Sequence, residues 1–392
     1  MLFQLLQYQP KPLNLRAFTF TRFGTISMRP TDIDPNDYQK QLQNKISLVK
    51  HAFENYQMPE LETFESAAEH YRMRAEFRIW HEGDELYHVM FDQQTKEKYK
   101  VEYFPPASKL INDVMVDLTD LLKPNDLVRR KLFQIDYLSS LSGQIVVTLV
   151  YHKALDESWR LEMQKIRDQL RKSYEIDIIG RAKKLKVLLD KDYVIEQLPI
   201  NDRTYLFKQV ENSFTQPNAG VNSKMIEWAL DVTRNSQGDL LELYCGLGNF
   251  SLPLAENFNK VLATEISKSS VAAAQANISL NGIENVTILR MSSEEFVQAN
   301  RGDRLFRRLE GIDLADYECQ TILVDPPRSG LDDATIDMVK DYQNIVYISC
   351  NPDTLKSNLN VLNCTHKVVR FALFDQFPYT HHAECGVYLQ KI

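Results

Sequence analysis

Cys350 stands between an apolar run at residues 345–349, which is typical of a strand, and a helix start signal at the next residue. Asn351 is a favoured helix N-cap, and Pro352 is a favoured first helical residue. The thiol is therefore expected beside the positive end of a helix dipole, which favours the nucleophilic thiolate. A buried structural cysteine is the alternative, because a lone free cysteine is usually a small inert apolar residue.

A glycine turn follows a second predicted strand at residues 240–244. Gly246 and Gly248 would let the backbone approach a nucleotide-like ligand closely, while Ser251 replaces the third glycine of a dinucleotide pattern. This favours a nucleoside without phosphates. Glu265 ends the next predicted strand, where a carboxylate could accept hydrogen bonds from ribose hydroxyls. Together these features indicate S-adenosylmethionine.

A rigid acidic turn, Asp325-Pro326-Pro327-Arg328, ends another predicted strand at residues 321–324. It is expected at the carboxyl edge of the sheet, where ligands bind. Amine methyltransferases carry an aromatic residue after a similar turn, so the arginine disfavours that chemistry. RNA cytosine-C5 enzymes place a cysteine close behind the turn, and the sequence has none between Cys319 and Cys350. Cytosine is disfavoured as well.

Composition excludes several classes of protein. No apolar run approaches the roughly 20 residues of a membrane span, and a net charge of −7 argues against a protein that coats nucleic acid nonspecifically. All five cysteines fall in the C-terminal half with no repeated spacing and no secretory segment before them. A reduced, cytoplasmic location is expected. A chain of 392 residues favours two domains.

The spacing of apolar residues divides the chain. After residue 216, short apolar strands alternate with helical stretches, which is typical of an α/β doubly wound parallel sheet, and two final strands joined by a loop would add an antiparallel edge. Before it, a helix pattern at 35–53 leads into strand hairpins and two further helices. We predict a non-core extension at 1–27, an α+β domain at 28–205 and a Rossmann-like domain at 206–392.

The motifs, in this order, resemble those of the RNA uracil-C5 methyltransferases. The resemblance is carried by residues 216–218, 246–249, 325–328, 349–352 and 384–387. Segments 70–78, 91–95 and 374–382 are similar to the members that make ribothymidine in the tRNA T-loop. The resemblance spans residues 28–392 and implies a class I S-adenosylmethionine-dependent fold with an N-terminal RNA-binding domain.

The resemblance also implies roles for single residues. Cys350 would add to uracil C6, and Glu384 would remove the C5 proton so that the sulfur can leave. The implied cofactor contacts are Gln216, Tyr244, Asn249, Glu265 and Asp325. The implied RNA contacts are Arg78, Phe133, His152 and Arg328. Core packing of Phe133 and a structural salt bridge of Arg328 stay open as alternatives.

The implied partner is the T-arm of tRNA, with tmRNA that carries a tRNA-like T-loop as a further substrate and a monomer as the expected state. Ribosomal RNA as the substrate, or an RNA-folding role, are the alternatives. No cysteine precedes Cys245, so the N-terminal iron–sulfur cluster of some ribosomal RNA relatives is not expected. Neither is a metal at His381 and His382, because adjacent side chains in a strand diverge.

Overall fold

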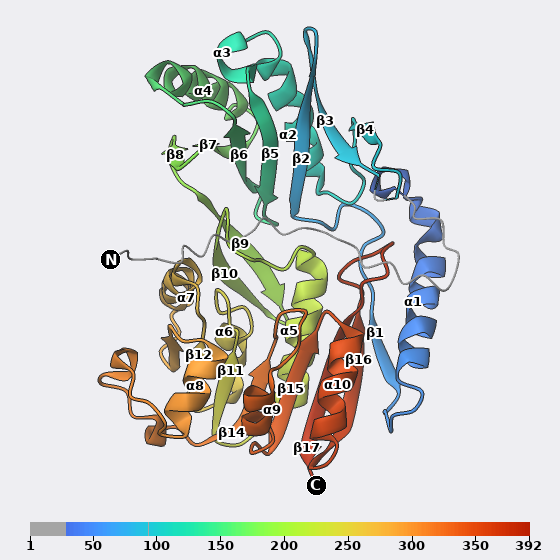
Figure 1. Cartoon of the computed structure of the whole chain (residues 1–392), viewed down its shortest axis with the longest axis vertical. Helices are drawn as coiled ribbons and strands as arrows, with labels where there is room; N and C mark the ends of the chain where they lie inside the picture. The colour runs from blue at the N-terminus through green and yellow to red at the C-terminus, as the bar shows by residue number, and fades with distance from the viewer. Residues whose placement is uncertain (1–28, 93) are drawn as a thin grey trace, which may run out of the picture.

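The computed structural model describes residues 29–92 and 94–392, which form two stacked parts (Figure 1). An eight-stranded sheet forms the core of one part, a seven-stranded sheet forms the core of the other, and a two-stranded hairpin lies between them. The predicted extension at 1–27 lies outside the described residues. No helix of the described ranges is long and apolar enough to cross a membrane.

The larger sheet confirms the predicted doubly wound α/β architecture. Its strand order is β1-β16-β17-β15-β14-β11-β12-β13. β17 is antiparallel to both neighbours, whereas every other pair is parallel. The predicted antiparallel strand is therefore present, but the prediction that it forms the edge of the sheet is wrong, because β16 and β1 lie outside it. The bounds are β1 (Leu61–Phe64), β11 (Asp239–Leu243), β12 (Val261–Thr264), β13 (Val286–Leu289), β14 (Cys319–Val324), β15 (Asn344–Ser349), β16 (His366–Phe374) and β17 (Glu384–Lys391).

Helices cover both faces of this sheet, because alternate residues of each strand point to opposite sides. Leu240, Leu323 and Val346 pack under α5 (Ala219–Thr233), α6 (Ser251–Leu254) and α7 (Lys268–Asn281). Leu241 and Ile322 pack on the other side under α1 (Tyr38–Ala52), α8 (Ser293–Asn300), α9 (Asp333–Val339) and α10 (Pro352–Leu362). Short 3₁₀ turns occur at Pro30–Asp32, Pro35–Asp37, Ala255–Asn257, Arg307–Leu309 and Leu314–Asp316.

The first elements of the chain belong to the larger sheet. The predicted helix at 35–53 is confirmed by α1, whose Val49 and Phe53 pack with Phe371 of β16. β1 pairs in parallel with β16, from Leu61 opposite Phe371 to Phe64 opposite Phe374. The chain therefore contributes to the larger sheet, builds the smaller one and then returns. These two elements lie within the stretch that the sequence-based division assigned to the N-terminal domain.

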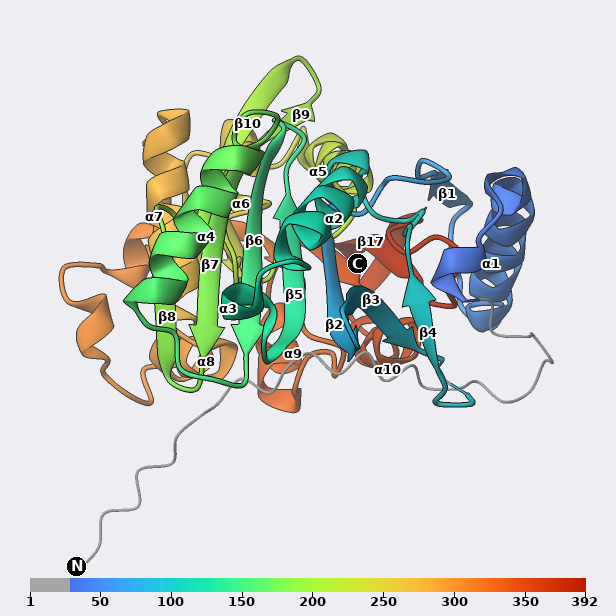
Figure 2. The same ribbon diagram turned by 90° about the horizontal axis from the view of Figure 1, so that it is seen from above.

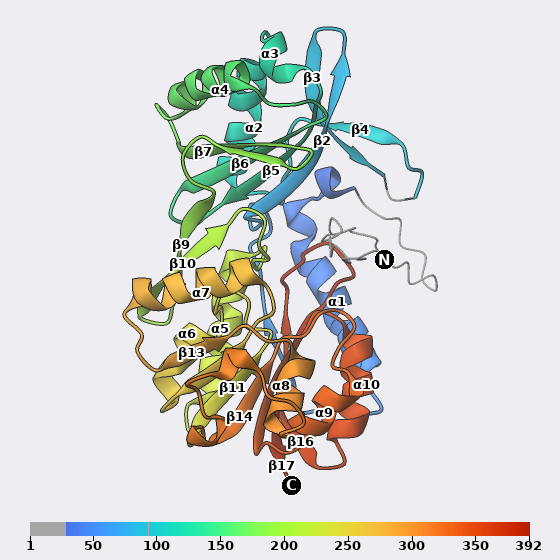
Figure 3. The ribbon, with the colours of Figure 1, turned by 60° about the vertical axis from the view of Figure 1, so that its left-hand side comes forward.

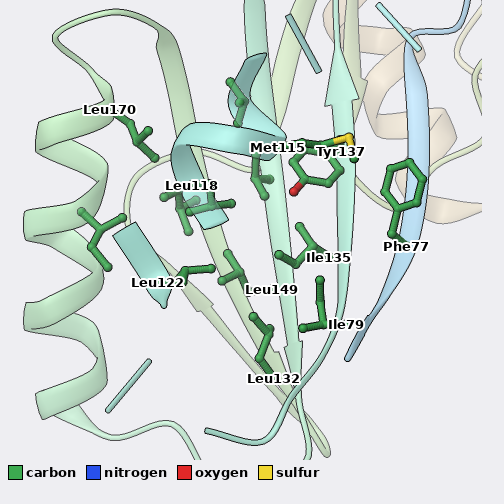
Figure 4. Packing of buried hydrophobic residues seen from close by; sticks show 14 of the residues in the cluster. Phe77, Ile79, Met115, Leu118, Leu122, Leu132, Ile135, Tyr137, Leu149 and Leu170 are labelled. Atoms are coloured by element: carbon green, nitrogen blue, oxygen red, sulfur yellow. The ribbon is translucent and has the colours of Figure 1, made fainter. Parts of the chain in front are cut away.

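The smaller sheet has the order β4-β3-β2-β5-β6-β7-β8 and is antiparallel except for β6 and β7. Helices α2 (Lys109–Leu122) and α4 (Glu157–Leu170) cover one face (Figures 2 and 4). Both predicted hairpins are confirmed. The bounds are β2 (Arg74–Glu82), β3 (Glu85–Phe91), β4 (Lys98–Val101), β5 (Leu132–Ser139), β6 (Gln144–Tyr151), β7 (Glu175–Ala182) and β8 (Leu185–Leu188), with a short α3 (Asp126–Arg129).

The hairpin β9 (Tyr193–Ile200) and β10 (Arg203–Val210) joins the two parts (Figure 3). Two amide oxygens of α7 accept hydrogen bonds from β10, Asn281 from the backbone of Leu206 at 2.9 Å and Asn277 from Lys208 at 2.7 Å. On the other side, Val194 packs with Leu138 and other residues of the smaller sheet. The hairpin therefore fixes the smaller sheet over one end of the larger one.

Candidate active site

The carboxyl edge of the larger sheet faces the smaller sheet. The C terminus, at the end of β17, lies at the far end of the molecule from the smaller sheet (Figure 1). β15 runs antiparallel to β17, so Cys350, directly after β15, and Glu384, the first residue of β17, lie at the near end. The ends of β11, β12 and β14 share this edge because these strands are parallel to β15. The predicted site residues of the larger sheet are therefore gathered between the two parts.

Cys350 and Glu384 occupy neighbouring strand ends. The last registered pair of β15 and β17 is Ser349 with Cys385, so the next positions in register are Cys350 and Glu384. The predicted N-cap is confirmed, since the side chain of Asn351 accepts a hydrogen bond from the backbone of Asp353 at 3.1 Å. The same amide donates to the backbone oxygen of Arg328 at 3.0 Å. This bond fixes the Asp325–Arg328 turn against the Cys350 junction.

Two carboxyl groups lie at this edge, Glu384 buried and Asp325 half-buried. Burial raises the pKa of Asp325 to about 7. Burial also raises the pKa of Glu384 well above its usual range, the charge of Asp325 raises it further, and the guanidinium of Arg328 opposes both effects. Glu384 is only 3% exposed. Two acids so placed cannot both ionise easily, so the pair retains a proton near neutral pH.

The thiol of Cys350 is not held as a thiolate by this surrounding. Burial raises the pKa of Cys350 to about 12, Glu384 and Asp325 raise it further, and Arg328 lowers it. The prediction that the helix N-terminus favours thiolate is therefore wrong for this arrangement. A helix dipole contributes only about 0.3–1 kcal/mol, which is less than the effect of burial together with two nearby acids.

The glycine turn and Glu265 form one unit. The carboxylate of Glu265 accepts from the backbone of Gly246 at 3.1 Å and from that of Ser267 at 2.7 Å. Gly246 has φ +56°, and a Cβ added there would meet no atom within 4 Å. Gly248 has φ +85°, and a Cβ there would overlap Leu252. The backbone at Gly246 therefore borders open space beside a carboxylate, which fits a nucleoside.

Tyr244 and Asn249 flank this turn in the chain, whereas Gln216 contacts the loop between β16 and β17. Tyr244 donates its hydroxyl to Ser293 at 2.7 Å. Asn249 and Asn222 exchange two amide hydrogen bonds, at 2.8 and 2.9 Å, while Gln216 accepts from Gln376 at 3.0 Å. These neutral groups, together with the carboxyl groups of Glu265 and Asp325, fit a cationic nucleoside without phosphates.

The predicted RNA contacts Arg78, Phe133 and His152 form a single stack. The guanidinium carbon of Arg78 lies 3.9 Å from the centroid of the Phe133 ring. That ring stacks on His152 with centroids 4.0 Å apart and an interplanar angle of 26°. Phe133 is half-buried and lies outside the buried cluster under α2 and α4, so the core alternative is not what the structure shows. Arg78 is exposed on the face of β2 opposite Phe77 and Ile79, which point toward the helices.

A family model described as tRNA (Uracil-5-)-methyltransferase matches residues 37–392. The chain belongs to this family. It is 72% identical over 364 residues to the tRNA/tmRNA (uracil-C(5))-methyltransferase of Pseudoalteromonas atlantica, covering 93% of this chain and 100% of the relative. The relative of the same name from Psychromonas ingrahamii is 60% identical over 359 residues, covering 92% and 98%. The resemblance to the RNA uracil-C5 methyltransferases is thereby confirmed, and the chain is a tRNA uracil-C5 methyltransferase.

A solved structure supports the fold. The Pyrococcus abyssi tRNA (uracil-54, C5)-methyltransferase, in complex with S-adenosyl-L-homocysteine, superposes with a TM-score of 0.67 at 19% identity, covering 90% of this chain and 83% of that one. The predicted S-adenosylmethionine-dependent methyltransferase fold is therefore confirmed.

Three further findings concern this methyltransferase. The salt-bridge alternative for Arg328 is not observed, because no ion pair of the described ranges includes it. Burial lowers the pKa of His382 to about 4. No cluster of three or more side chains that could hold a metal ion occurs within residues 29–92 and 94–392.

Sequence reasoning missed Glu242, which lies beneath the glycine turn. Its carboxyl accepts a hydrogen bond from Ser251, and burial raises its pKa to about 8. The replacement of the third glycine by Ser251 therefore has a local partner inside the fold. An acidic residue within a buried strand of apolar residues was the available signal.

Proposed function

We propose that this methyltransferase modifies the T-loop uridine of tRNA through a covalent bond between Cys350 and C6 of uracil, with Glu384 as the base that releases the product. The observation that carries the proposal is the placement of Cys350 and Glu384 at adjacent strand ends, beside Asp325 and the cofactor turn. When bound, S-adenosylmethionine supplies a methyl group on a positively charged sulfur. The residues that would hold it are Gln216, Tyr244, Asn249, Glu265 and Asp325.

Addition of the sulfur to C6 activates the neighbouring carbon. As the S–C6 bond forms, the electrons of the C5=C6 double bond move onto C5 and O4, and C5 becomes nucleophilic. The thiol proton must leave at the same time. The adjacent acceptor is Asp325, whose raised pKa suits it to receive a proton near neutral pH.

Release reverses the addition on the methylated base. Glu384, as a carboxylate, removes the proton from C5, and the electrons of that C–H bond restore the C5=C6 double bond. The S–C6 bond breaks and the sulfur leaves with its electrons, to be protonated again. The charge of Asp325 favours the neutral form of Glu384, and the charge of Arg328 favours the carboxylate form of Glu384. Loss of one proton from the Asp325–Glu384 pair therefore leaves Glu384 able to act as the base.

The stack of Arg78, Phe133 and His152 is proposed to hold the T-arm while the target base leaves its own stack. Flipping a loop base costs a few kcal/mol, and stacking on an aromatic ring returns about 1–3 kcal/mol per base. Arg328, exposed beside the Cys350 junction, is proposed to contact the uracil carbonyl. The names of the two bacterial relatives support tmRNA as a second substrate. We further propose a cytoplasmic monomer without a metal or an iron–sulfur cluster.

The proposal is tested with Glu384→Gln, S-adenosylmethionine and an unmodified T-arm RNA. We expect a methylated protein–RNA complex that survives denaturing electrophoresis, because the amide cannot remove the C5 proton. Cys350→Ala is expected to form no complex and no 5-methyluridine, and an RNA with cytidine at the target position should be inert. Methylation by Cys350→Ala at the wild-type rate would refute the covalent route.

A further inference from the structure

The loop between β16 and β17, residues 375–383, is held by the first helix of the chain. Lys45 of α1 places its ammonium 2.6 Å from a carboxylate oxygen of Asp375 and 2.8 Å from the backbone oxygen of Phe377. Gln41, one turn earlier, donates to the other carboxylate oxygen of Asp375 at 2.8 Å and accepts from the backbone of Tyr379 at 3.0 Å. The loop is thus fixed at three of its residues by one face of α1.

Lys45 occupies a position where an apolar residue is expected. The buried face of α1 consists of Tyr38, Leu42, Lys45 and Val49, which share a helical stripe. Lys45 is 4% exposed and Asp375 is 0% exposed. A buried ion pair contributes little net stability and can often be replaced by apolar residues at no loss. A role in geometry therefore accounts for the pair better than a role in stability.

The same loop connects the two halves of the proposed chemistry. At the start of the loop, Asp375 directly follows Phe374, the residue of β16 that pairs with Glu384 of β17. The backbone N–H of Asp375 donates a hydrogen bond to the backbone oxygen of Phe64 of β1 at 2.9 Å. Gln376 donates to Gln216, a proposed cofactor contact. At its end the loop leads directly into Glu384. Movement at Asp375 would therefore shift Glu384, whereas Cys350, on β15, has its own support in the Asn351 cap.

We infer that Lys45 and Asp375 are positioning residues for Glu384, so that α1 controls release of the RNA from Cys350 and has little influence on formation of the adduct. This inference rests on the proposed role of Glu384 as the base. Misplacement of a catalytic group by about 1 Å can slow its step about 100-fold. The charged pair specifies one geometry for the loop, since the ammonium must meet both the Asp375 carboxylate and the Phe377 carbonyl.

The test uses the full chain with Lys45→Met or Asp375→Asn in single-turnover reactions with ordinary tRNA and S-adenosylmethionine. We expect the methylated covalent complex to form within about 2-fold of the wild-type rate and to decay about 10- to 100-fold more slowly. Lys50→Met changes an exposed lysine of the same helix and should match the wild type in both steps. Equal slowing of formation and decay, or unchanged decay, overturns the inference.

Two further variants separate the possible failures. If Glu384→Gln itself accumulates no complex, the proposed base is wrong. If it accumulates the complex while folded Lys45→Met does not, only the positioning role is wrong. Should Lys45→Met fail to fold, Gln41→Ala keeps the buried ion pair and removes the two hydrogen bonds of the glutamine. Decay slowed about 3- to 10-fold is then expected, and wild-type decay in that variant overturns the inference.

Discussion

The raised pKa of Asp325 makes the folded enzyme less stable as the pH rises. Below about pH 4 the carboxyl is protonated in both the folded and the unfolded chain and has no effect. From pH 4 to about 7 the unfolded chain releases this proton while the folded chain keeps it, so stability falls with pH. Above pH 7 the loss is complete. Asp325→Asn should remove this pH dependence and abolish most activity.

The magnitude follows from the shift from 3.8 to about 7. Each pH unit corresponds to about 1.4 kcal/mol, which sets an upper limit of about 4 kcal/mol. The Asp325 side chain is half-buried, and its contact with solvent reduces this change in the free energy of unfolding to about half of the upper limit. Between pH 5 and pH 8, the free energy of unfolding of the wild type is therefore expected to fall by about 1–3 kcal/mol more than that of Asp325→Asn. This corresponds to about 1–4 °C in Tm for a chain of 392 residues.

Melting curves of the wild type and Asp325→Asn at pH 5 and pH 8 measure this difference. Asp341→Asn, which changes an exposed carboxyl in the turn between α9 and β15, is the control and should keep the wild-type slope. The comparison uses the change in Tm with pH, because a buried amide carries its own desolvation cost at both pH values. Equal slopes in the wild type and Asp325→Asn would refute the reasoning.

Three further predictions concern single groups. Glu384→Gln should lower the pKa of Cys350, so alkylation of this thiol by iodoacetamide at pH 8 is expected to become several-fold faster. Arg328→Met should slow the alkylation. Peptide mass spectrometry measures the alkylated product. Phe133→Ala removes the ring between Arg78 and His152, and the loss of about 1–3 kcal/mol of stacking should raise the KM for tRNA about 5- to 150-fold while calorimetry finds cofactor affinity unchanged. Gly248→Ala places a Cβ against Leu252 at positive φ and should lower the Tm more than Gly246→Ala, which faces open space and should chiefly weaken cofactor binding.

The motifs of the larger sheet could be predicted because each lies where a strand ends. In a parallel sheet all such ends meet at one edge, so Gly246, Glu265, Asp325 and Cys350 could be grouped from strand spacing alone. Resemblance to the family added Glu384, whose place opposite Cys350 depends on the antiparallel direction of β17. The hairpin of β9 and β10 was missed. The sequence signal for this hairpin was an asparagine, Asn201, in a two-residue segment between two alternating runs. In the structure Asn201 adopts φ +49°, as such a turn requires.

Long-range pairing and burial could not be predicted from local patterns. β1 is short and pairs with β16, more than 300 residues later in the chain, and no local period indicates that partner. The helix signal at Asn351 was correct, yet the pKa of Cys350 depends on carboxyl groups brought near by other strands. Likewise, no local pattern indicates that Lys45 of α1 is buried, because its partner Asp375 comes from the β16–β17 loop.

The most direct test of the account is reaction with tRNA in which 5-fluorouracil replaces uracil. Fluorine at C5 cannot leave as a proton does, so the chain is expected to remain attached to the RNA after methyl transfer. Digestion and mass spectrometry should find the T-loop nucleotide on the peptide that contains Cys350. A fully active enzyme that forms no adduct, or one attached at another residue, would contradict the proposal that Cys350 is the nucleophile.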